Sequence, residues 1–163
     1  MQIKVAKTAC FCMGVKRAMD MVLDASGPER KPVLTYGPLI HNPQVLQMLR
    51  SRNINIIENL EEGDPGSHIV IRTHGVSPET RKKIKEKSFK VSDATCPLVA
   101  RVQGTVKRYA KQGYSTVIVG DEGHAEIIGL MGFTEGKGVV IKSPDQVNTL
   151  PPMERVCVVG QTT

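Results

Sequence analysis

The segment from Lys90 to Val119 reads KVSDATCPLVARVQGTVKRYAKQGYSTVIV and decides the fold class. Its two ends, Lys90-Val91-Ser92 and Ser115–Val119, are short runs that favour β-strands, and the stretch from Pro97 to Gln112 between them favours a helix. A strand followed by a helix and another strand is typical of parallel sheets with crossover helices. The segment therefore predicts an α/β protein.

The same alternation extends over the rest of the chain. In the region from Gly14 to Ala25, apolar side chains recur at helical spacing, which predicts an amphipathic helix after the first loop. We predict further strands at 2–6, 32–35, 68–71 and 155–159, and further helices at 43–52, 77–87 and 126–132. These elements predict small three-layer domains with mostly parallel sheets.

The turn at Thr95-Cys96-Pro97 separates two sets of such units. We therefore divide the chain into a first α/β domain, residues 1–95, and a second, residues 96–163. The last strand is not followed by a helix before Thr163, so we expect the second domain to be truncated and the chain to be part of a longer protein.

Composition narrows the class of protein. The chain has 163 residues, of which 40% are apolar, enough to bury a core. The residues from Met1 to Met13 lack the apolar run of a signal peptide, and no later segment reaches membrane-spanning length, so we expect a cytoplasmic protein. Its four cysteines are too sparse for a secreted disulfide scaffold, which leaves ligands, catalysts or core residues.

Much of the net charge of +6 comes from the run Arg81–Lys87 and from Lys90 just beyond it. Such a run is either a solvated helix face or a docking surface for an acidic partner. Three Tyr, three Phe and no Trp argue against a stacking surface for single strands, so no nucleic acid is expected.

Residues with ligand or acid-base chemistry collect at the predicted strand ends. Ligands bind beyond the carboxyl ends of parallel strands, where loops and helix N-termini converge. Three of these loops lead into Asn42-Pro43, Ser77-Pro78 and Cys96-Pro97, which are helix starts that favour a phosphate or a thiolate. The residues that follow the strands, in chain order, are Cys12, His41, His74, Cys96, His124 and Gln161-Thr162. We expect them to face a common hollow.

Other residues have plainer interpretations. Cys157 lies within an apolar strand and is expected in the core, and His68 begins a strand and is expected to be structural. Cys10 is two residues from Cys12, so in an extended segment the two point to opposite sides, and we expect only Cys12 to face the hollow. Glu126 is either an acid that suits a helix N-terminus or a proton-transfer group.

Six motifs in order resemble those of the 4-hydroxy-3-methylbut-2-enyl diphosphate reductase family, which acts last in the methylerythritol phosphate route to isoprenoids. The resemblance covers essentially the whole chain. The motifs are Phe11-Cys12-Met13-Gly14-Val15-Lys16-Arg17-Ala18, His41-Asn42, Thr73-His74-Gly75-Val76, Asp93-Ala94-Thr95-Cys96-Pro97-Leu98-Val99, Gly123-His124-Ala125-Glu126 and Gln161-Thr162-Thr163.

The resemblance implies a 4Fe-4S cluster held by three cysteines, of which Cys12 and Cys96 are two. It also implies that His41, His74 and His124 surround the substrate diphosphate, that Thr162 lies near the substrate and that Glu126 relays protons. The expected reaction is reductive dehydration of an allylic diphosphate to isopentenyl and dimethylallyl diphosphate, with electrons from ferredoxin or flavodoxin.

The chain departs from the family pattern in two respects. Cys10 and Met13 stand where the family has small residues, beside the first ligand. The family also continues into a third domain that carries the third cysteine, beyond Gln161-Thr162-Thr163. The alternative is therefore a non-catalytic fragment that binds a diphosphate or a metal.

Overall fold

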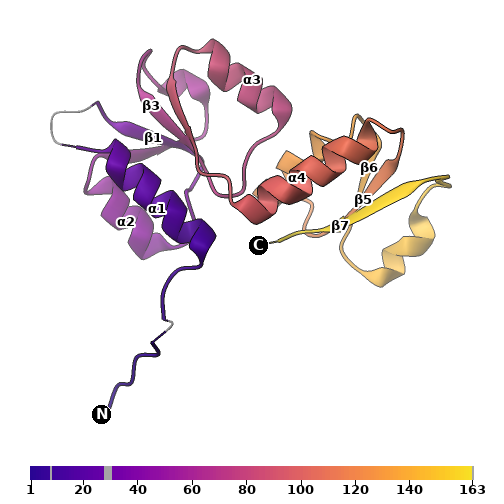
Figure 1. Cartoon of the computed structure of the whole chain (residues 1–163), viewed down its shortest axis with the longest axis horizontal. Coiled ribbons are helices and arrows are strands. Elements are labelled where there is room, and N and C mark those ends of the chain that lie inside the picture. The colour runs from indigo at the N-terminus through magenta and orange to yellow at the C-terminus, as the bar shows by residue number, and fades with distance from the viewer. Residues whose placement is uncertain (8, 28–30, 163) are drawn as a thin grey trace.

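The computed structural model describes residues 1–7, 9–27 and 31–162 and contains two parallel sheets (Figure 1). The first has the strand order β2-β1-β3-β4 and the second has the order β6-β5-β7. Neighbouring strands of both sheets run parallel, which confirms the predicted α/β class. The strands are β1 (Val33–Tyr36), β2 (Ile54–Ile57), β3 (His68–Ile71), β4 (Lys90–Asp93), β5 (Ser115–Val119), β6 (Gly138–Ile141) and β7 (Val156–Gly160).

The helices begin where the sequence predicted helix starts. The side chain of Asn42 accepts a hydrogen bond from the Val45 N–H, and that of Ser77 accepts one from the Thr80 N–H, so each caps the helix that follows it. A proline opens α2, α3 and α4. The helices are α1 (Met13–Ala25), α2 (Pro43–Arg50), α3 (Pro78–Glu86), α4 (Pro97–Ala110) and α5 (Ala125–Met131), with short 3-10 helices η1 (Leu60–Glu62) and η2 (Pro144–Thr149).

The first sheet is the middle layer of three. On one face, Ala18 and Val22 of α1 and Leu49 of α2 pack with strand residues in one apolar cluster. On the other face, Ile84 of α3 packs with a separate set of strand side chains. Alternating strand residues supply the two clusters because successive side chains point to opposite faces. This arrangement places the helix N-termini near the carboxyl ends of the strands.

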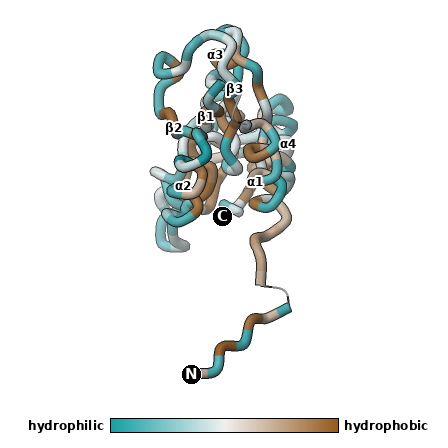
Figure 2. The backbone as a smooth tube through the Cα atoms, turned by 90° about the vertical axis from the view of Figure 1, so that its left-hand side faces the viewer, coloured by the Kyte–Doolittle hydropathy of each residue, from teal (hydrophilic) through white to brown (hydrophobic). Residues whose placement is uncertain are grey.

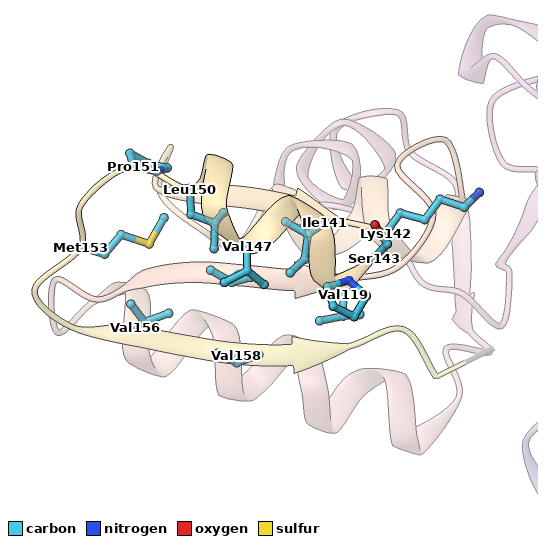
Figure 3. Close-up of a pocket in the computed structure, with 12 residues that line it drawn as sticks. Val119, Ile141, Lys142, Ser143, Val147, Leu150, Pro151, Met153, Val156 and Val158 are labelled. Carbon is cyan, nitrogen blue, oxygen red and sulfur yellow. The ribbon is translucent and has the colours of Figure 1, made fainter.

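The second sheet is covered differently on its two faces. Val106 of α4 and Ile127 and Leu130 of α5 pack with Ile118 of β5 on one face. The opposite face carries η2 and a hollow of about 650 Å³ (Figure 3). The apolar side chains of this hollow include Val117, Val119, Val147, Leu150, Val156 and Val158. None of the predicted site residues lines it, so this hollow is separate from the chemistry described below.

One predicted strand is wrong and two strands escaped prediction. Residues 2–6 form no strand but an extended segment that leads away from the helices (Figure 2), and Ile3 and Val5 are exposed. A short apolar run becomes a strand only where a neighbour completes its hydrogen bonds, and this one lies beside neither sheet. β2 and β6 were not predicted: Asn55 interrupts the apolar residues of β2, and β6 begins at Gly138, just after Gly136, so that its apolar run is only three residues long.

The boundary predicted between residues 95 and 96 falls between β4 of the first sheet and α4, which packs on the second. The division into domains 1–95 and 96–163 stays a prediction. Within the described part of the chain, no helix is both long and apolar enough to span a bilayer.

Candidate functional site

Three histidines from loops of both sheets come together. His41 follows β1, His74 follows β3, and His124 is the residue before the first turn of α5. The ring centroids of His41 and His74 are 5.0 Å apart, those of His74 and His124 are 5.1 Å apart, and those of His41 and His124 are 6.1 Å apart. One ring nitrogen of each lies within 4.8 Å of those of the other two. The predicted convergence of these imidazoles is therefore observed.

His74 is the buried member of this trio. His74 is only 4% exposed, and within the described residues its Nδ1 has no hydrogen-bond partner. Burial, and then the neighbouring imidazoles of His124 and His41, lower the pKa of His74 to about 4. The ring is thus neutral at pH 7, and its Nδ1 is available to bind a ligand.

A hydrogen bond of His124 indicates whether this ligand is an anion or a cation. Its Nδ1 accepts a 3.2 Å hydrogen bond from the Glu126 backbone N–H. A neutral imidazole that accepts at Nδ1 carries its proton on Nε2, and that N–H donates. A metal ion would need the Nε2 lone pair and would force a proton onto Nδ1, against the backbone N–H. The capping bond therefore favours an anionic ligand at the trio.

Glu126 itself is buried and joined to Thr162. The residue is 0% exposed, although it lies in the first turn of α5. Its Oε1 accepts hydrogen bonds from the Thr162 N–H, at 2.9 Å, and from the Thr162 hydroxyl, at 2.8 Å. Thr162 is exposed, so its hydroxyl links the buried carboxyl to the space outside. Glu126 is therefore a buried acid of the first turn of α5 that faces Thr162, and its role in proton transfer stays a prediction.

The sulfurs of Cys12 and Cys96 lie on the same side of the molecule. Cys12 is the N-cap residue of α1 and Cys96 is that of α4. A Cβ added at Gly14 would lie 2.7 Å from the Cys96 Sγ and 4.0 Å from the Cys12 Sγ, so the two sulfurs are no farther apart than the sum of these distances. The Cys96 N–H also donates to the carbonyl of Thr73, which places Cys96 beside the loop of His74.

The other cysteines occupy different surroundings. All four are free thiols; Cys10 and Cys12 are exposed, and Cys157 is buried, as its apolar neighbours predicted. Burial raises the pKa of the Cys157 thiol, although Arg108 acts in the opposite direction. The thiols of Cys12 and Cys96 are at least partly accessible and both lie close to Gly14, an arrangement that fits an iron–sulfur group. The buried Cys157 does not fit such a group. His68, expected to be structural, lies in β3 and shares a 2.8 Å hydrogen bond with Ser92.

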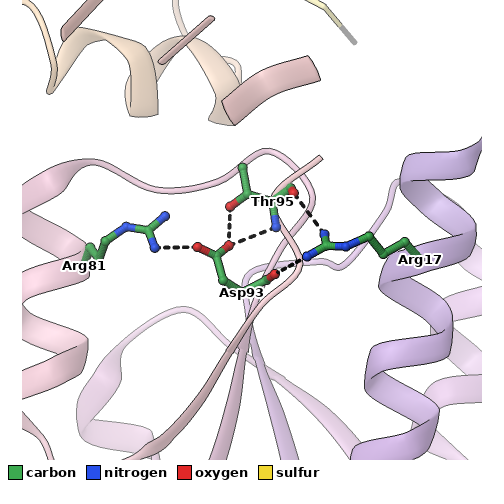
Figure 4. A network of polar contacts seen from close by, with 4 residues as sticks. All are labelled: Arg17, Arg81, Asp93 and Thr95. Atoms are coloured by element: carbon green, nitrogen blue, oxygen red, sulfur yellow. Dashed lines mark hydrogen bonds and ion pairs between the residues drawn. The ribbon is translucent and has the colours of Figure 1, made fainter. Parts of the chain in front are cut away.

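A polar network that the sequence did not indicate holds the loop before Cys96. Arg17 of α1 donates to the backbone carbonyls of Asp93 and Thr95, at 3.1 and 3.2 Å. Arg81 of α3 pairs with the Asp93 carboxylate from the other side (Figure 4). Burial would raise the pKa of Asp93, but hydrogen bonds from Thr95 and Arg81 outweigh it and lower that pKa. The motifs contain these residues, but their pairing is a long-range contact that spacing alone does not reveal.

The fold and site together define a class: parallel α/β proteins in which thiols and imidazoles from two sheets gather at the strand ends. A family model described as "LytB protein" matches residues 3–163, and the chain belongs to this family. The family resemblance drawn from the motifs is thereby confirmed.

Named relatives agree with this membership. The chain is 42% identical over 173 residues to a 4-hydroxy-3-methylbut-2-enyl diphosphate reductase of Opitutus terrae, covering 100% of the chain and 60% of that protein. It is 42% identical over 167 residues to one of Clostridium tetani, covering 100% of the chain and 26% of that protein. The chain thus spans at most about three fifths of the length of these relatives.

Two solved structures share the fold. One is a structure of (E)-4-hydroxy-3-methyl-but-2-enyl diphosphate reductase, with a TM-score of 0.82 and 38% identity over 99% of this chain and 58% of its own. The corresponding reductase from Plasmodium falciparum has a TM-score of 0.88 and 28% identity over 96% of this chain and 50% of its own.

Proposed function

We propose that this chain is the part of a 4-hydroxy-3-methylbut-2-enyl diphosphate reductase that contributes two cysteine ligands, the diphosphate-binding histidines and the proton relay. The reaction is the reductive dehydration of that diphosphate to isopentenyl and dimethylallyl diphosphate. The observation that carries the proposal is the bond between the Thr162 hydroxyl and the buried Glu126, two residues from a histidine trio that suits an anion. Family membership and the names of the relatives support the same activity.

Cys12 and Cys96 would hold the cluster. They are free, accessible at least in part, and directed toward the same glycine. A cluster bound there supplies electrons and a Lewis acid for the departing hydroxyl group. The protein contributes ligand placement, substrate binding and protons.

The three imidazoles would bind the diphosphate. His124 presents its Nε2–H because the backbone of Glu126 occupies its Nδ1. His74 is neutral and would bind through hydrogen bonds rather than through charge. His41 is the exposed member of the trio, so its ring borders the solvent. A hydrogen bond from the neutral imidazole of His74 would orient the anion without adding a full countercharge.

Glu126 and Thr162 would deliver protons. Overall, the C–O bond of the allylic alcohol breaks, water leaves, and the allylic fragment gains two electrons and one proton while the departing hydroxyl gains the other. When Glu126 is protonated, its O–H can donate to the Thr162 hydroxyl oxygen across the same 2.8 Å contact while the Thr162 O–H donates to the departing hydroxyl, since one hydroxyl has one proton and two lone pairs. A proton can therefore pass between the buried carboxyl and the substrate through this hydroxyl.

The electrons would come from an acidic protein such as ferredoxin or flavodoxin. Arg81, Lys82 and Lys85 of α3 and Lys107 of α4 line a shared groove of about 430 Å³. Several cations of α3 are paired with acids on the same helix, for example Lys83 with Glu79, so part of the run is a solvated face. A cytoplasmic location stays a prediction.

Iron and acid-labile sulfide analysis of the whole protein after anaerobic reconstitution tests the proposal, together with its visible spectrum and turnover of the allylic diphosphate. We expect bound iron and sulfide, and their loss in Cys12→Ser and Cys96→Ser but not in Cys157→Ala. A colourless, iron-free protein with its cysteines intact would refute the assignment. Calorimetric binding of the diphosphate without turnover would favour the non-catalytic alternative.

A further inference from the structure

The side chains of Cys12 and Cys96 are not held by the helices that they begin. Each occupies an N-cap position, where a side chain commonly bonds to the backbone of the next turn, yet neither thiol makes such a bond. The separation of the two sulfurs must therefore be set by how closely the start of α1 and the start of α4 approach each other.

Arg17 joins these two elements. It lies on α1 slightly more than one turn after Cys12. Its Nη2 donates to the Asp93 carbonyl at 3.1 Å and its Nη1 donates to the Thr95 carbonyl at 3.2 Å (Figure 4). The planar guanidinium therefore spans the two carbonyls on either side of Ala94, which is fully buried. Cys96 is the next residue along the chain.

The turn that Arg17 contacts is itself held from the opposite side. The Asp93 carboxylate accepts hydrogen bonds from the N–H and the hydroxyl of Thr95 and pairs with Arg81 of α3. The backbone carbonyl of Asp93 thus binds Arg17 of α1, and its carboxylate binds Arg81 of α3. The residues before Cys96 are fixed between two helices, so a movement of α1 would be transmitted directly to the thiol.

Gly14 sets the limit of the approach. A Cβ at this position would lie 2.7 Å from the Cys96 Sγ and 3.4 Å from the Cys96 Cβ, and the first distance is too short for two side-chain atoms. Gly14 lies in the first turn of α1, between Cys12 and Arg17. The hydrogen bonds of Arg17 hold α1 against the loop, and the missing side chain of Gly14 leaves room for the sulfur.

We propose that Arg17 and Gly14 are positioning residues that set the distance between the Cys12 and Cys96 sulfurs, with Asp93 and Thr95 as the surface against which Arg17 holds α1. This assignment does not depend on turnover. The roles of Arg17 and Gly14 apply to any ligand that the two thiols share. They can therefore be wrong while the reductase assignment is right, and they can be right while the reductase assignment is wrong.

Cross-linking of the two thiols in the 163-residue chain tests the proposal. Dibromobimane becomes fluorescent when it has reacted with two neighbouring thiols, and mass spectrometry identifies the linked peptides. The background variant is Cys10→Ser, which removes the competing thiol. In that background we expect Arg17→Met to slow the Cys12–Cys96 cross-link roughly tenfold, because two charge-assisted hydrogen bonds are lost, and Arg17→Lys to have an intermediate effect.

Lys16→Met is the matched control. Lys16 is the neighbouring cation on α1, and its ion pair with Asp20 lies on the solvent side. The control should cross-link at the rate of the background variant. Alkylation with monobromobimane, which needs one thiol only, should be unchanged in Arg17→Met, and the buried Cys157 should stay unlabelled, which separates repositioning from unfolding.

Gly14→Ala provides a second, independent variant. Alanine is favoured in helices, so the fold should persist while the new methyl group displaces the Cys96 sulfur. We expect a cross-linking rate changed at least threefold, roughly. Equal rates for Arg17→Met and Lys16→Met would overturn the role of Arg17, and an unchanged rate in Gly14→Ala would overturn that of Gly14.

Discussion

The hydroxyl of Thr162 donates a 2.8 Å hydrogen bond to Oε1 of Glu126, a carboxyl group with no exposure to solvent. Thr162 follows β7 and Glu126 lies in α5, so the contact joins two strand ends of the second sheet. The same oxygen also accepts the Thr162 N–H, at 2.9 Å. The carboxyl is therefore oriented toward the loop in which the substrate is proposed to bind.

Glu126→Gln should retain the fold and the bound iron of the whole protein but lower turnover by at least about a hundredfold, the lower range for loss of a general acid. The amide keeps the shape of the side chain and an oxygen that can accept from Thr162, but it does not transfer a proton. Turnover and iron content of the same preparation are the measurements. Glu122→Gln, at an exposed residue of the preceding loop, is the control; equal turnover in both variants would remove the relay assignment.

His74 should make the protein less stable in mild acid. Its pKa is about 4 in the folded protein and near 6.5 when unfolded, so the unfolded state binds more protons between these values. The free energy of unfolding therefore falls as the pH drops from about 6.5 to about 4, by an amount that approaches about 3 kcal/mol.

Urea denaturation at pH 7 and pH 4.5 measures this effect. His74→Gln should show a smaller loss than the wild type, because the amide does not titrate. His68→Gln, at a histidine of β3 outside the trio, measures separately what a second histidine contributes. If His74→Gln loses as much stability as the wild type over this interval, another group is responsible.

Gly75→Ala should destabilise the fold by roughly 2–4 kcal/mol, from the cost of a left-handed backbone and of overpacking. Gly75 has a φ of 68°, and its Cβ would lie 2.6 Å from the Gln103 Nε2 and 3.0 Å from the Thr95 Cγ2. Gly136→Ala isolates the backbone cost, because Gly136 has a φ of 80° with no atom within 4 Å of the added carbon. Chemical denaturation should give a clearly lower free energy of unfolding for Gly75→Ala than for Gly136→Ala. Similar losses in the two variants would mean that the residues around Gly75 move to make room for the methyl group.

Gly104→Ala should stabilise the protein by about 0.5–1 kcal/mol, since glycine inside a helix is less favourable than alanine. Gly104 lies in the middle of α4, and a Cβ there would meet nothing within 4 Å. A higher melting temperature in calorimetry is the expected result. A lower one would show that the helix packs more closely at this position than the structure indicates.

Much of the site was predictable because parallel sheets impose a rule on it. His41, His74 and His124 each follow a strand, and loops at the carboxyl ends of parallel strands must converge. The rule failed at the N-terminus, where residues 2–6 pair with no strand in the described chain, yet Cys12 still lies at a helix start. The position of Cys12 depends on α1 rather than on a preceding strand.

The sequence by itself determined the α/β class, the capped helix starts at Asn42 and Ser77, and the family, because strand and helix preferences, caps and ordered motifs are local properties of the chain. Only the tertiary structure decided that Arg17 reaches the carbonyls of Asp93 and Thr95, that Glu126 is buried beneath Thr162, and that the capping of α5 makes His124 a donor. These are contacts between side chains and distant backbone or loops. They depend on how closely helices and loops approach in space, a quantity that residue spacing does not contain.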